Sequence, residues 1–554
     1  MRLLDSRRLT GPNLQTRLPA ALAEVAFEPG EDPERAVATW AAEVRRLSAA
    51  IGLEAKDPRA RHFPGGAALT LTAPIDVLLV ATDVAELAVE VASGREARPE
   101  LPALSGLPAL PGLPELPGLP ELGARLAAER NPRLLELQSA ARARGLPFLW
   151  DDQAISIGAG LRSQTFSRDQ LPSAAELDWT ALGTIPIALI TGTNGKTTSA
   201  RLLARIVRCA GLVPGLASTE AVAVDEVVLS SGDYTGPHAA RLVLRNRLVQ
   251  VAVLETARGG ILRRGLAVEE ADAALITNVG DDHLGEYGIA TVAELARTKA
   301  LVGQVSRTVV LNADDPELGR LSFDSKPIIR FSLNREASPA AGWFAREGAL
   351  WHGERALLRI DEIPIAFGGA ARYNVANALG AAALAHALGL PDAAIAAGLR
   401  SFTAHDNPGR ANLYQLRDGV RVLVDFGHNP HGVRAATPLW ASLRANGRLV
   451  VIAGHPGDRS DDNSRELAVA IAEARPARVL LRDLDGYLRG RAPGETPGIL
   501  RDELLRRGVQ DVSIASSETG ALRLALDSAA RGDLIVVLAH LESESVGALL
   551  RERG

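Results

Sequence analysis

The sequence has 554 residues, 47% of them hydrophobic, and a formal net charge of −5, so it can bury several cores, and a prior of roughly 150 residues per domain predicts three or four domains. The slightly acidic balance excludes a whole-chain positive field that would hold nucleic acid or an anionic membrane surface, which favours small-molecule substrates. A single cysteine, Cys209, excludes an intramolecular disulfide framework and a cysteine-rich zinc site.

Cys209 lies in an apolar helical run, and we expect it in a core. The N-terminus has no signal-peptide hydrophobic region, and no run of about 18 apolar residues occurs. We therefore expect a cytoplasmic protein without membrane-spanning segments.

Residues 1–97 predict a small α+β domain, with apolar alternation at 68–73 and 75–81 and a helical pattern from Pro33 to Ile51. From 98 to 123, closely spaced prolines disfavour helix and central strand, which predicts an extended linker or, alternatively, a proline-rich docking peptide. Residues 124–180 predict a connector, helical at 124–144 and then irregular.

From residue 181 onward, apolar strand patterns alternate with amphipathic helices, which is typical of buried parallel strands in α/β domains. The predicted strands are 185–190, 248–254, 273–278 and 307–312, and then 421–426, 448–453, 477–481 and 533–538. We predict two α/β domains, at 181–408 and 409–554, with a boundary near Pro408 and Gly409.

The segment ThrGlyThrAsnGlyLysThrThr at 191–198 lies between a predicted strand and a predicted helix. Glycines let a backbone approach phosphates, N–H groups and a helix N-terminus attract negative charge, and lysine bridges terminal phosphates. The spacing is two residues shorter than the common phosphate loop, and the alternative is a glycine-rich turn without a ligand. The residues predicted to hold ATP are Gly192, Thr193, Asn194, Gly195, Lys196, Thr197 and Thr198.

This loop resembles the nucleotide loop of the Mur ligase family, and the remaining motifs are similar to the cyanophycin synthetase-like branch of that family. The similar stretches are SerGlyAspTyrThrGlyProHis (231–238), LeuGluThrAlaArgGlyGlyIleLeuArg (254–263), AsnValGlyAspAspHisLeuGly (278–285), AsnAlaAspAspPro (312–316), AsnProGlyArgAlaAsnLeu (407–413), ValAspPheGlyHisAsnPro (424–430) and GlyHisProGlyAspArg (454–459). The resemblance covers residues 181–554 and implies the central ATP-binding domain and the C-terminal domain of that family.

The first 180 residues depart from that branch. Residues 8–14 and 143–149 resemble the opening of its N-terminal domain and the start of its ATP-grasp domain. Between 149 and 181 there is no room for an ATP-grasp module, so the resemblance implies an enzyme that lacks this first ligase.

Glu255 ends a predicted strand at the edge where α/β sheets bind ligands, which predicts a magnesium ligand shared with Thr197 or, alternatively, a capping or surface carboxylate. The resemblance implies that His283 ligates a second magnesium ion and that Lys299 occupies a position often carbamylated in Mur ligases. Carbamylation creates an anionic oxygen ligand, which arginine cannot imitate, and only four of the 61 basic residues are lysines. The alternative is that Lys299 pairs with a phosphate or a carboxylate.

The resemblance assigns the remaining site residues, and closure of 409–554 onto 181–408 is expected to complete the site. Lys196 and Arg258 are candidates for stabilising the reaction intermediate, and His428 for orienting the site. The expected nucleotide contacts are Asn312 and Asn374 on the adenine side, and Arg410 and Asp425 at the phosphate and ribose. The expected substrate contacts are Thr235, Gly236, Pro237 and His238, and also Arg489 and Arg491, whose alternative is a surface pair.

Together these features predict an ATP-dependent ligase that activates a carboxylate as an acyl phosphate, couples it to an amino-acid amine and releases ADP. The expected cofactors are ATP and two Mg²⁺ ions, and the expected partners are a small-molecule or peptide carboxylate and an amino acid, with no nucleic acid or membrane. The resemblance also implies a homo-oligomer. The alternatives are a folate-type or other glutamyl or peptide ligase and a catalytically silent scaffold; Arg-Gly-Gly at 258–260 favours the cyanophycin synthetase-like branch.

Overall fold

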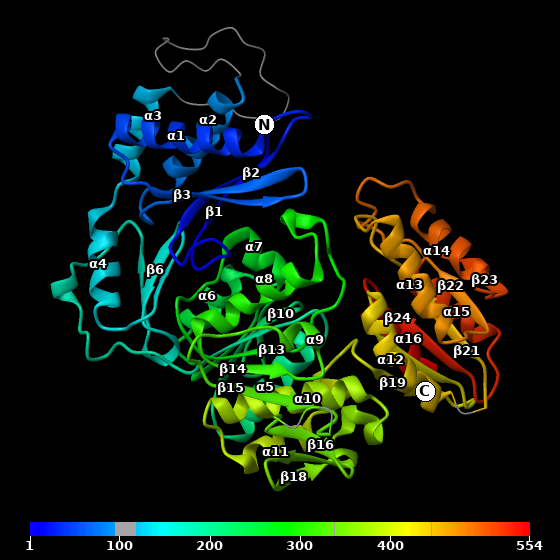
Figure 1. The fold of residues 1–554 in the computed structure, drawn as a ribbon. Coiled ribbons are helices and arrows are strands. Elements are labelled where there is room, and N and C mark those ends of the chain that lie inside the picture. Colours follow the sequence, from blue (N-terminus) through cyan, green and yellow to red (C-terminus); the bar gives the residue numbers. More distant parts are fainter. Residues whose placement is uncertain (95–117, 337, 339, 445, 554) are drawn as a thin grey trace.

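The computed structural model describes residues 1–94, 118–336, 338, 340–444 and 446–553, and its strands form four sheets (Figure 1). The first sheet is antiparallel, in the order β1 (Arg2–Leu9), β2 (Ala20–Ala26), β4 (Gly66–Thr72) and β3 (Lys56–Phe63). Helices α1 (Pro33–Ile51) and α2 (Leu78–Ala92) pack on it. Asp32 caps the start of α1, and Gly52 ends it in the left-handed conformation.

This N-terminal sheet rests directly on the central region. The N–H of Thr10 donates to the carbonyl of Arg264 at 2.7 Å, and β1 contacts α7 (Arg258–Arg264). Because both faces are covered, every residue of β4 is buried, although its sequence alternates Leu with Thr. The contact places β1 beside the helices that surround the site described below.

The apolar alternation at 75–81 does not form a strand, because these residues enter helix α2. The helix continues past Ala81 to Ala92, and the buried positions Leu78, Ala81, Ala85 and Ala88 follow helical spacing. Seven residues of apolar alternation are too few to distinguish the two periods.

The predicted linker at 98–123 lies outside the described residues up to 117, and its last residues form α3 (Leu119–Glu129), which opens with Pro120 in its first turn. Helix α4 (Pro132–Arg142) follows after the N-cap Asn131. A sheet of β5 (Phe148–Trp150), β6 (Ala154–Ile157) and β7 (Gln164–Ser167) comes next. Leucines of α3 and α4 share one core with the first sheet, so the connector packs as part of the N-terminal region.

The central sheet has 11 strands, in the order β11-β10-β9-β12-β8-β13-β14-β15-β16-β17-β18. The strands from β9 to β16 are parallel, and antiparallel hairpins extend both edges. The bounds are β8 (Ile187–Thr191), β9 (Pro214–Ala217), β10 (Ala221–Val224), β11 (Val227–Ser231), β12 (Val251–Glu255), β13 (Ala271–Ile276), β14 (Ser306–Asn312), β15 (Ile328–Ser332), β16 (Trp343–Arg346), β17 (Ala349–His352) and β18 (Arg355–Arg359).

Helices cover both faces of this sheet. One face packs against α5 (Lys196–Cys209), α10 (Arg372–Ala387) and α11 (Asp392–Ser401), and the other against α6 (Pro237–Arg245), α7 and α8 (Val292–Val305); the short α9 (Pro316–Gly319) follows β14. The prediction that Cys209 lies in a core is wrong: this last residue of α5 is exposed, because the buried face of the helix ends at Val207.

The C-terminal sheet has six strands, in the order β19-β20-β24-β21-β22-β23, and only β19 is antiparallel. Its bounds are β19 (Asn412–Gln415), β20 (Arg421–Asp425), β21 (Leu449–Ala453), β22 (Arg478–Leu481), β23 (Asp511–Ile514) and β24 (Leu534–Leu538). Its helices are α12 (Pro430–Leu443), α13 (Asp461–Glu473), α14 (Glu495–Arg506), α15 (Glu518–Asp527) and α16 (Ser543–Arg553).

These sheets confirm the predicted α/β class and all eight strands expected after residue 181, each within three residues. The boundaries of the predicted domains stay predictions. In the described part of the chain, no helix is long and apolar enough to cross a membrane.

Candidate active site

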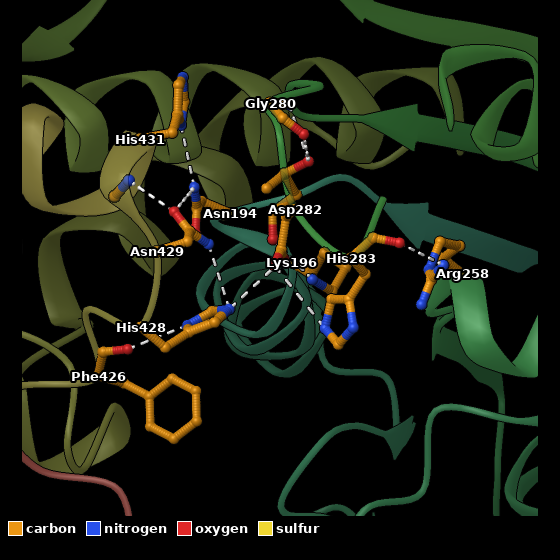
Figure 2. Close-up of polar contacts among 12 residues, drawn as sticks. Asn194, Lys196, Arg258, Gly280, Asp282, His283, Phe426, His428, Asn429 and His431 are labelled. Carbon is orange, nitrogen blue, oxygen red and sulfur yellow. Dashed lines mark hydrogen bonds and ion pairs between the residues drawn. The ribbon is translucent and has the colours of Figure 1, made fainter. Parts of the chain in front are cut away.

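A cavity of about 1480 Å³ lies where the N-terminal, central and C-terminal regions meet. The carboxyl ends of the parallel strands of the central and C-terminal sheets border it, which is where α/β folds bind ligands. Figure 2 shows its centre, where residues of the phosphate loop, the end of β13 and the start of α12 converge.

The phosphate loop runs from the end of β8 to the start of α5. The N–H groups of Thr193 and Asn194 donate to the carbonyl and the side-chain oxygen of Asn278, each at 2.9 Å. In return, Asn278 and the hydroxyl of Thr277 donate to the carbonyl of Asn194. The loop is therefore fixed by the segment after β13 and does not depend on a ligand for its shape.

Two loop positions accept only glycine. A Cβ at Gly192 would lie 1.8 Å from the Thr277 hydroxyl, and one at Gly195 would lie 2.2 Å from the side-chain oxygen of Asn377. Both residues also have positive φ, at 154° and 83°. The close approach supports the predicted loop geometry, with Lys196 opening α5 and its ammonium donating to the carbonyl of Thr193 at 2.9 Å.

Glu255 and Thr197 approach each other through Thr219. Both Glu255 carboxylate oxygens accept from Thr219, at 2.6 Å from its hydroxyl and 3.1 Å from its N–H. The Thr219 hydroxyl also lies 3.3 Å from that of Thr197. Glu255 stands behind Thr219, which lines the cavity. The carboxylate is 2% exposed, and no described basic side chain pairs with it, so this oxygen-rich, uncompensated anion fits a hard divalent cation.

Lys299 reaches the loop from α8. Its side chain is buried, and the ammonium donates to the carbonyl of Gly192 at 2.8 Å. Burial, together with the nearby charge of Lys196, holds the pKa of Lys299 well below its usual value. A depressed pKa raises the fraction of neutral amine, which is the nucleophilic form.

A cluster of charged groups follows β13. Asp282 lies 3.8 Å from His283 and 3.7 Å from His428, on either side of it (Figure 2). Arg459, from the C-terminal region, contacts both ring nitrogens of His283 and lies 3.2 Å from Glu286. Burial raises the pKa of Asp282, but His428, His283 and Arg459 outweigh it and hold that pKa well below the usual range.

Arg258 holds the same loop from α7. Its guanidinium donates to the carbonyl of His283 at 2.9 Å and to Glu286 at 2.6 Å. Because both contacts are to protein groups, Arg258 orients the loop that carries His283.

The surroundings of Glu286 predict how the free energy of unfolding depends on pH. Burial raises its pKa, but the hydrogen bond to His283 and the charge of Arg258 outweigh this and lower it to about 2 from 4.5. A carboxyl whose pKa is depressed on folding stabilises the fold above its unfolded pKa, and this contribution is lost as pH falls from 4.5 towards 2. In urea titrations at pH 5 and pH 3, the wild type should lose more unfolding free energy than Glu286→Gln; equal losses would contradict the assignment.

Asn194 joins the phosphate loop to the C-terminal region (Figure 2). Its side-chain amide and that of Asn429, the N-cap of α12, exchange hydrogen bonds of 3.1 and 3.0 Å. His431 lies 3.0 Å from the same Asn194 nitrogen. These contacts hold the two regions together across the cavity; that closure completes the site stays a prediction.

Asp425 and Arg410 line the C-terminal wall of the cavity. The Arg410 guanidinium lies 3.9 Å from the ring centroid of Phe426 and bonds to Glu220 at 3.2 Å. Asp425 accepts from the N–H of Phe426 at 2.6 Å and from Tyr373 at 3.3 Å. Burial raises the pKa of Asp425, against the opposing effects of the Phe426 N–H and Arg410.

Asn312 and Asn374 also line the cavity, but protein groups already use their amides. Asn312 donates to the carbonyl of Thr277 at 3.0 Å. Asn374 donates to the carbonyl of Ile365 and accepts from Asn377. Their predicted contacts with adenine stay predictions.

The predicted substrate loop Thr235, Gly236, Pro237 and His238 lines the cavity where α6 begins. Arg489 also lines it; its side chain is 54% exposed and 3.9 Å from Asp458. That exposed position leaves its predicted role open to test.

Arg491 has partners other than the predicted substrate carboxylate, and its predicted role stays a prediction. It does not line the cavity, and its guanidinium donates to the carbonyls of Gly457 and Arg459 and to Asp461 and Glu495, at 2.8 to 2.9 Å. With these protein partners, Arg491 braces the loop that carries Arg459.

Sequence reasoning missed Asp282, Arg459, Asn429 and Arg241, all of which line the cavity or adjoin its loop. The sequence did carry a signal for Arg459, because its motif GlyHisProGlyAspArg directly follows β21, at the edge of the sheet where ligands bind. Arg241 had no such signal, because it lies on the buried face of helix α6.

Comparisons with known proteins agree with this geometry. Residues 190–385 match the Mur ligase middle domain, and residues 409–541 match the Mur ligase, glutamate ligase domain. The UDP-N-acetylmuramoylalanine–D-glutamate ligase of Aromatoleum aromaticum is 30% identical over 382 residues, which span 65% of this chain and 70% of that one. The chain belongs to the Mur ligase family.

Within the Mur ligase family, a cyanophycin synthetase of Synechocystis sp. is 37% identical over 381 residues, 65% of this chain. The match spans only 43% of that relative's length. A bifunctional folylpolyglutamate synthase/dihydrofolate synthase, solved with Mn, AMPPNP and L-glutamate bound, is 22% identical with a TM-score of 0.51, over 66% of this chain and 89% of that one. This likeness confirms the Mur ligase fold.

Proposed function

We propose that this chain is an ATP-dependent, ADP-forming ligase that joins a carboxylate to the amine of an amino acid. The observation that carries the proposal is the convergence of Lys196, Lys299 and the Glu255–Thr219–Thr197 group on one cavity. At about 1480 Å³, the cavity exceeds the roughly 300–1,000 Å³ of a single small-molecule site. It therefore has room for a nucleotide and a second substrate.

A carboxylate is a poor electrophile, and ATP overcomes this by converting it to an acyl phosphate. A substrate carboxylate oxygen attacks the γ-phosphorus, a new O–P bond forms, and the bond to the β-phosphate oxygen breaks to release ADP. The amine nitrogen then attacks the acyl carbon, inorganic phosphate leaves, and one proton from nitrogen passes to solvent. Lys196, at the loop, neutralises charge on the γ-phosphoryl group during the first step.

Thr197 and Glu255 would hold a first magnesium ion. His283, once Arg459 releases one of its ring nitrogens, and a carbamylated Lys299 would hold a second. Bound magnesium would supply charge neutralisation at the transferring phosphoryl group. Carbamylation requires the neutral Lys299 amine to attack CO₂, forming an N–C bond and releasing one proton. The depressed pKa of Lys299 favours that form, and the product places an anion beside the loop.

Resemblance to cyanophycin synthetases at 37% identity supports an amino-acid amine and a peptide carboxylate as substrates. The test is ADP release by purified protein with Mg·ATP across a matrix of peptide and small-molecule carboxylates against individual amino acids, with each partner omitted in turn. We expect release that requires one carboxylate and one amine, and a product whose mass equals their sum minus water. Nucleotide binding without release for any pair would instead favour a silent scaffold.

A further inference from the structure

Three side chains that commonly bind metal ions meet near one end of the central sheet. His352 ends β17, His386 lies in the last turn of α10, and Asp392 opens α11. One ligand atom from each of these side chains lies within 4.8 Å of the other two. Figure 1 labels the neighbouring elements β16, β18 and α11 at the bottom of the molecule. We call these three residues the edge cluster.

The edge cluster is separate from the candidate active site. None of its three residues lines the cavity. Asn374, in the first turn of α10, does line it, and His386 lies near the other end of the same helix. At 1.5 Å per residue, these two positions are about 18 Å apart along the helix axis. A ligand of the edge cluster therefore touches neither the phosphate loop nor the reacting groups.

Packing already fixes the two imidazole rings. The ring of His352 stacks on that of Trp343, which is 1% exposed, with centroids 4.4 Å apart and an angle of 10° between the planes. His386 meets the His352 ring at an angle of 63°, also with centroids 4.4 Å apart. Among the residues that the structure describes, the nitrogens of both rings have no hydrogen-bond partner. Both histidines can therefore offer a nitrogen lone pair to a ligand.

Asp392 supplies an anionic oxygen beside these nitrogens. Its Oδ2 pairs with the Arg355 guanidinium at 3.0 Å, but the Arg355 side chain is 75% exposed, so solvent screens the pair and it holds the carboxylate only weakly. In the described part of the chain, Oδ1 has no hydrogen-bond partner. At least one oxygen of Asp392 is thus available to a cation.

We propose that the edge cluster binds a divalent transition-metal ion, with Zn²⁺ as the test case, through one nitrogen of each histidine and one oxygen of Asp392. Two imidazoles and a carboxylate are a ligand set that suits zinc, and water can complete the tetrahedron. With metal–ligand distances of about 2.0–2.2 Å, tetrahedral ligands lie about 3.4 Å apart. Small side-chain movements from the present separations bring the three ligand atoms to that spacing.

The ion would act on stability and not on the reaction. It would tie the hairpin that contains β17 to the turn between α10 and α11. Both helices pack against α5, which begins at the phosphate loop. An ion that binds only the folded chain raises its thermal stability, so the proposal goes beyond the ligase function and does not depend on it.

The test measures zinc affinity and thermal unfolding, with no need for ligase activity. Zn²⁺ is titrated into untagged, EDTA-treated full chain against a chromophoric chelator, with excess Mg²⁺ present to occupy oxygen-rich groups of the cavity. We expect the wild type to take Zn²⁺ from the chelator and to show a higher Tm with Zn²⁺ in circular dichroism. His386→Ala should lower the zinc affinity by about 100-fold or more, because it removes a direct ligand.

Asp392→Asn covers the case in which His386→Ala fails to fold, because it keeps the size of the side chain and removes only the anionic oxygen. It should weaken zinc binding by about tenfold or more and abolish the rise in Tm. His405→Ala, at an exposed histidine outside the cavity, is the matched control and should bind like the wild type. No zinc binding by the wild type, wild-type affinity in both cluster variants, or loss of binding in His283→Ala instead would overturn the proposal.

Discussion

Replacement of Lys196 by alanine is expected to lower the rate of ADP formation by about 10³-fold or more, since one donor aimed at developing charge contributes about 10²–10³ and Lys196 contributes a full charge. Among the residues that the structure describes, its ammonium donates only to the carbonyl of Thr193, so its remaining N–H groups can face a phosphate. The measurement is steady-state ADP release with saturating carboxylate and amine, alongside circular dichroism to verify folding.

The matched control for Lys196→Ala is Lys56→Ala, an exposed lysine in β3 outside the cavity. Its rate should equal that of the wild type. If Lys196→Ala retained more than about a tenth of the activity, Lys196 would not stabilise the transferring phosphoryl group.

Replacement of Lys299 by alanine is expected to lower turnover by about 10²-fold or more, because it removes both the proposed anionic magnesium ligand and its charge. Activity of the wild type should also fall in CO₂-depleted buffer and return on addition of bicarbonate. Bicarbonate dependence distinguishes carbamylation from a lysine that pairs directly with a phosphate.

Lys299→Arg is the decisive companion variant. Arginine keeps the positive charge and the capacity to donate to the carbonyl of Gly192 but cannot be carbamylated. It should be as inactive as Lys299→Ala. Full activity in Lys299→Arg, or indifference to bicarbonate in the wild type, would eliminate carbamylation while leaving the ligase proposal in place.

The predictions from sequence succeeded where the determinants are local. The phosphate loop follows from the spacing of glycines and lysine within residues 191–198, and buried parallel strands follow from unbroken apolar runs. The apolar run at 75–81 is ambiguous for a different reason. A short alternating run fits both the helical and the strand period, and tertiary packing favours helix α2.

The long-range contacts of the site were beyond prediction. His283 and Arg459 are 176 residues apart in sequence, and Arg241 and Thr10 are 231 apart, so neither pair has a local signature. Arg491 shows the same limit. Its motif predicts a positive charge, but only the fold shows that its guanidinium already donates to Asp461 and Glu495.

The cavity draws its walls from three regions with separate sheets, and only two of these carry the phosphate loop and its facing strands. Residues 1–180 therefore form part of the cavity wall without contributing to the phosphate loop. A chimera that exchanges residues 1–180 between relatives would change that part of the wall and leave the phosphate loop as it is, which offers a direct way to alter the ligands that the cavity accepts.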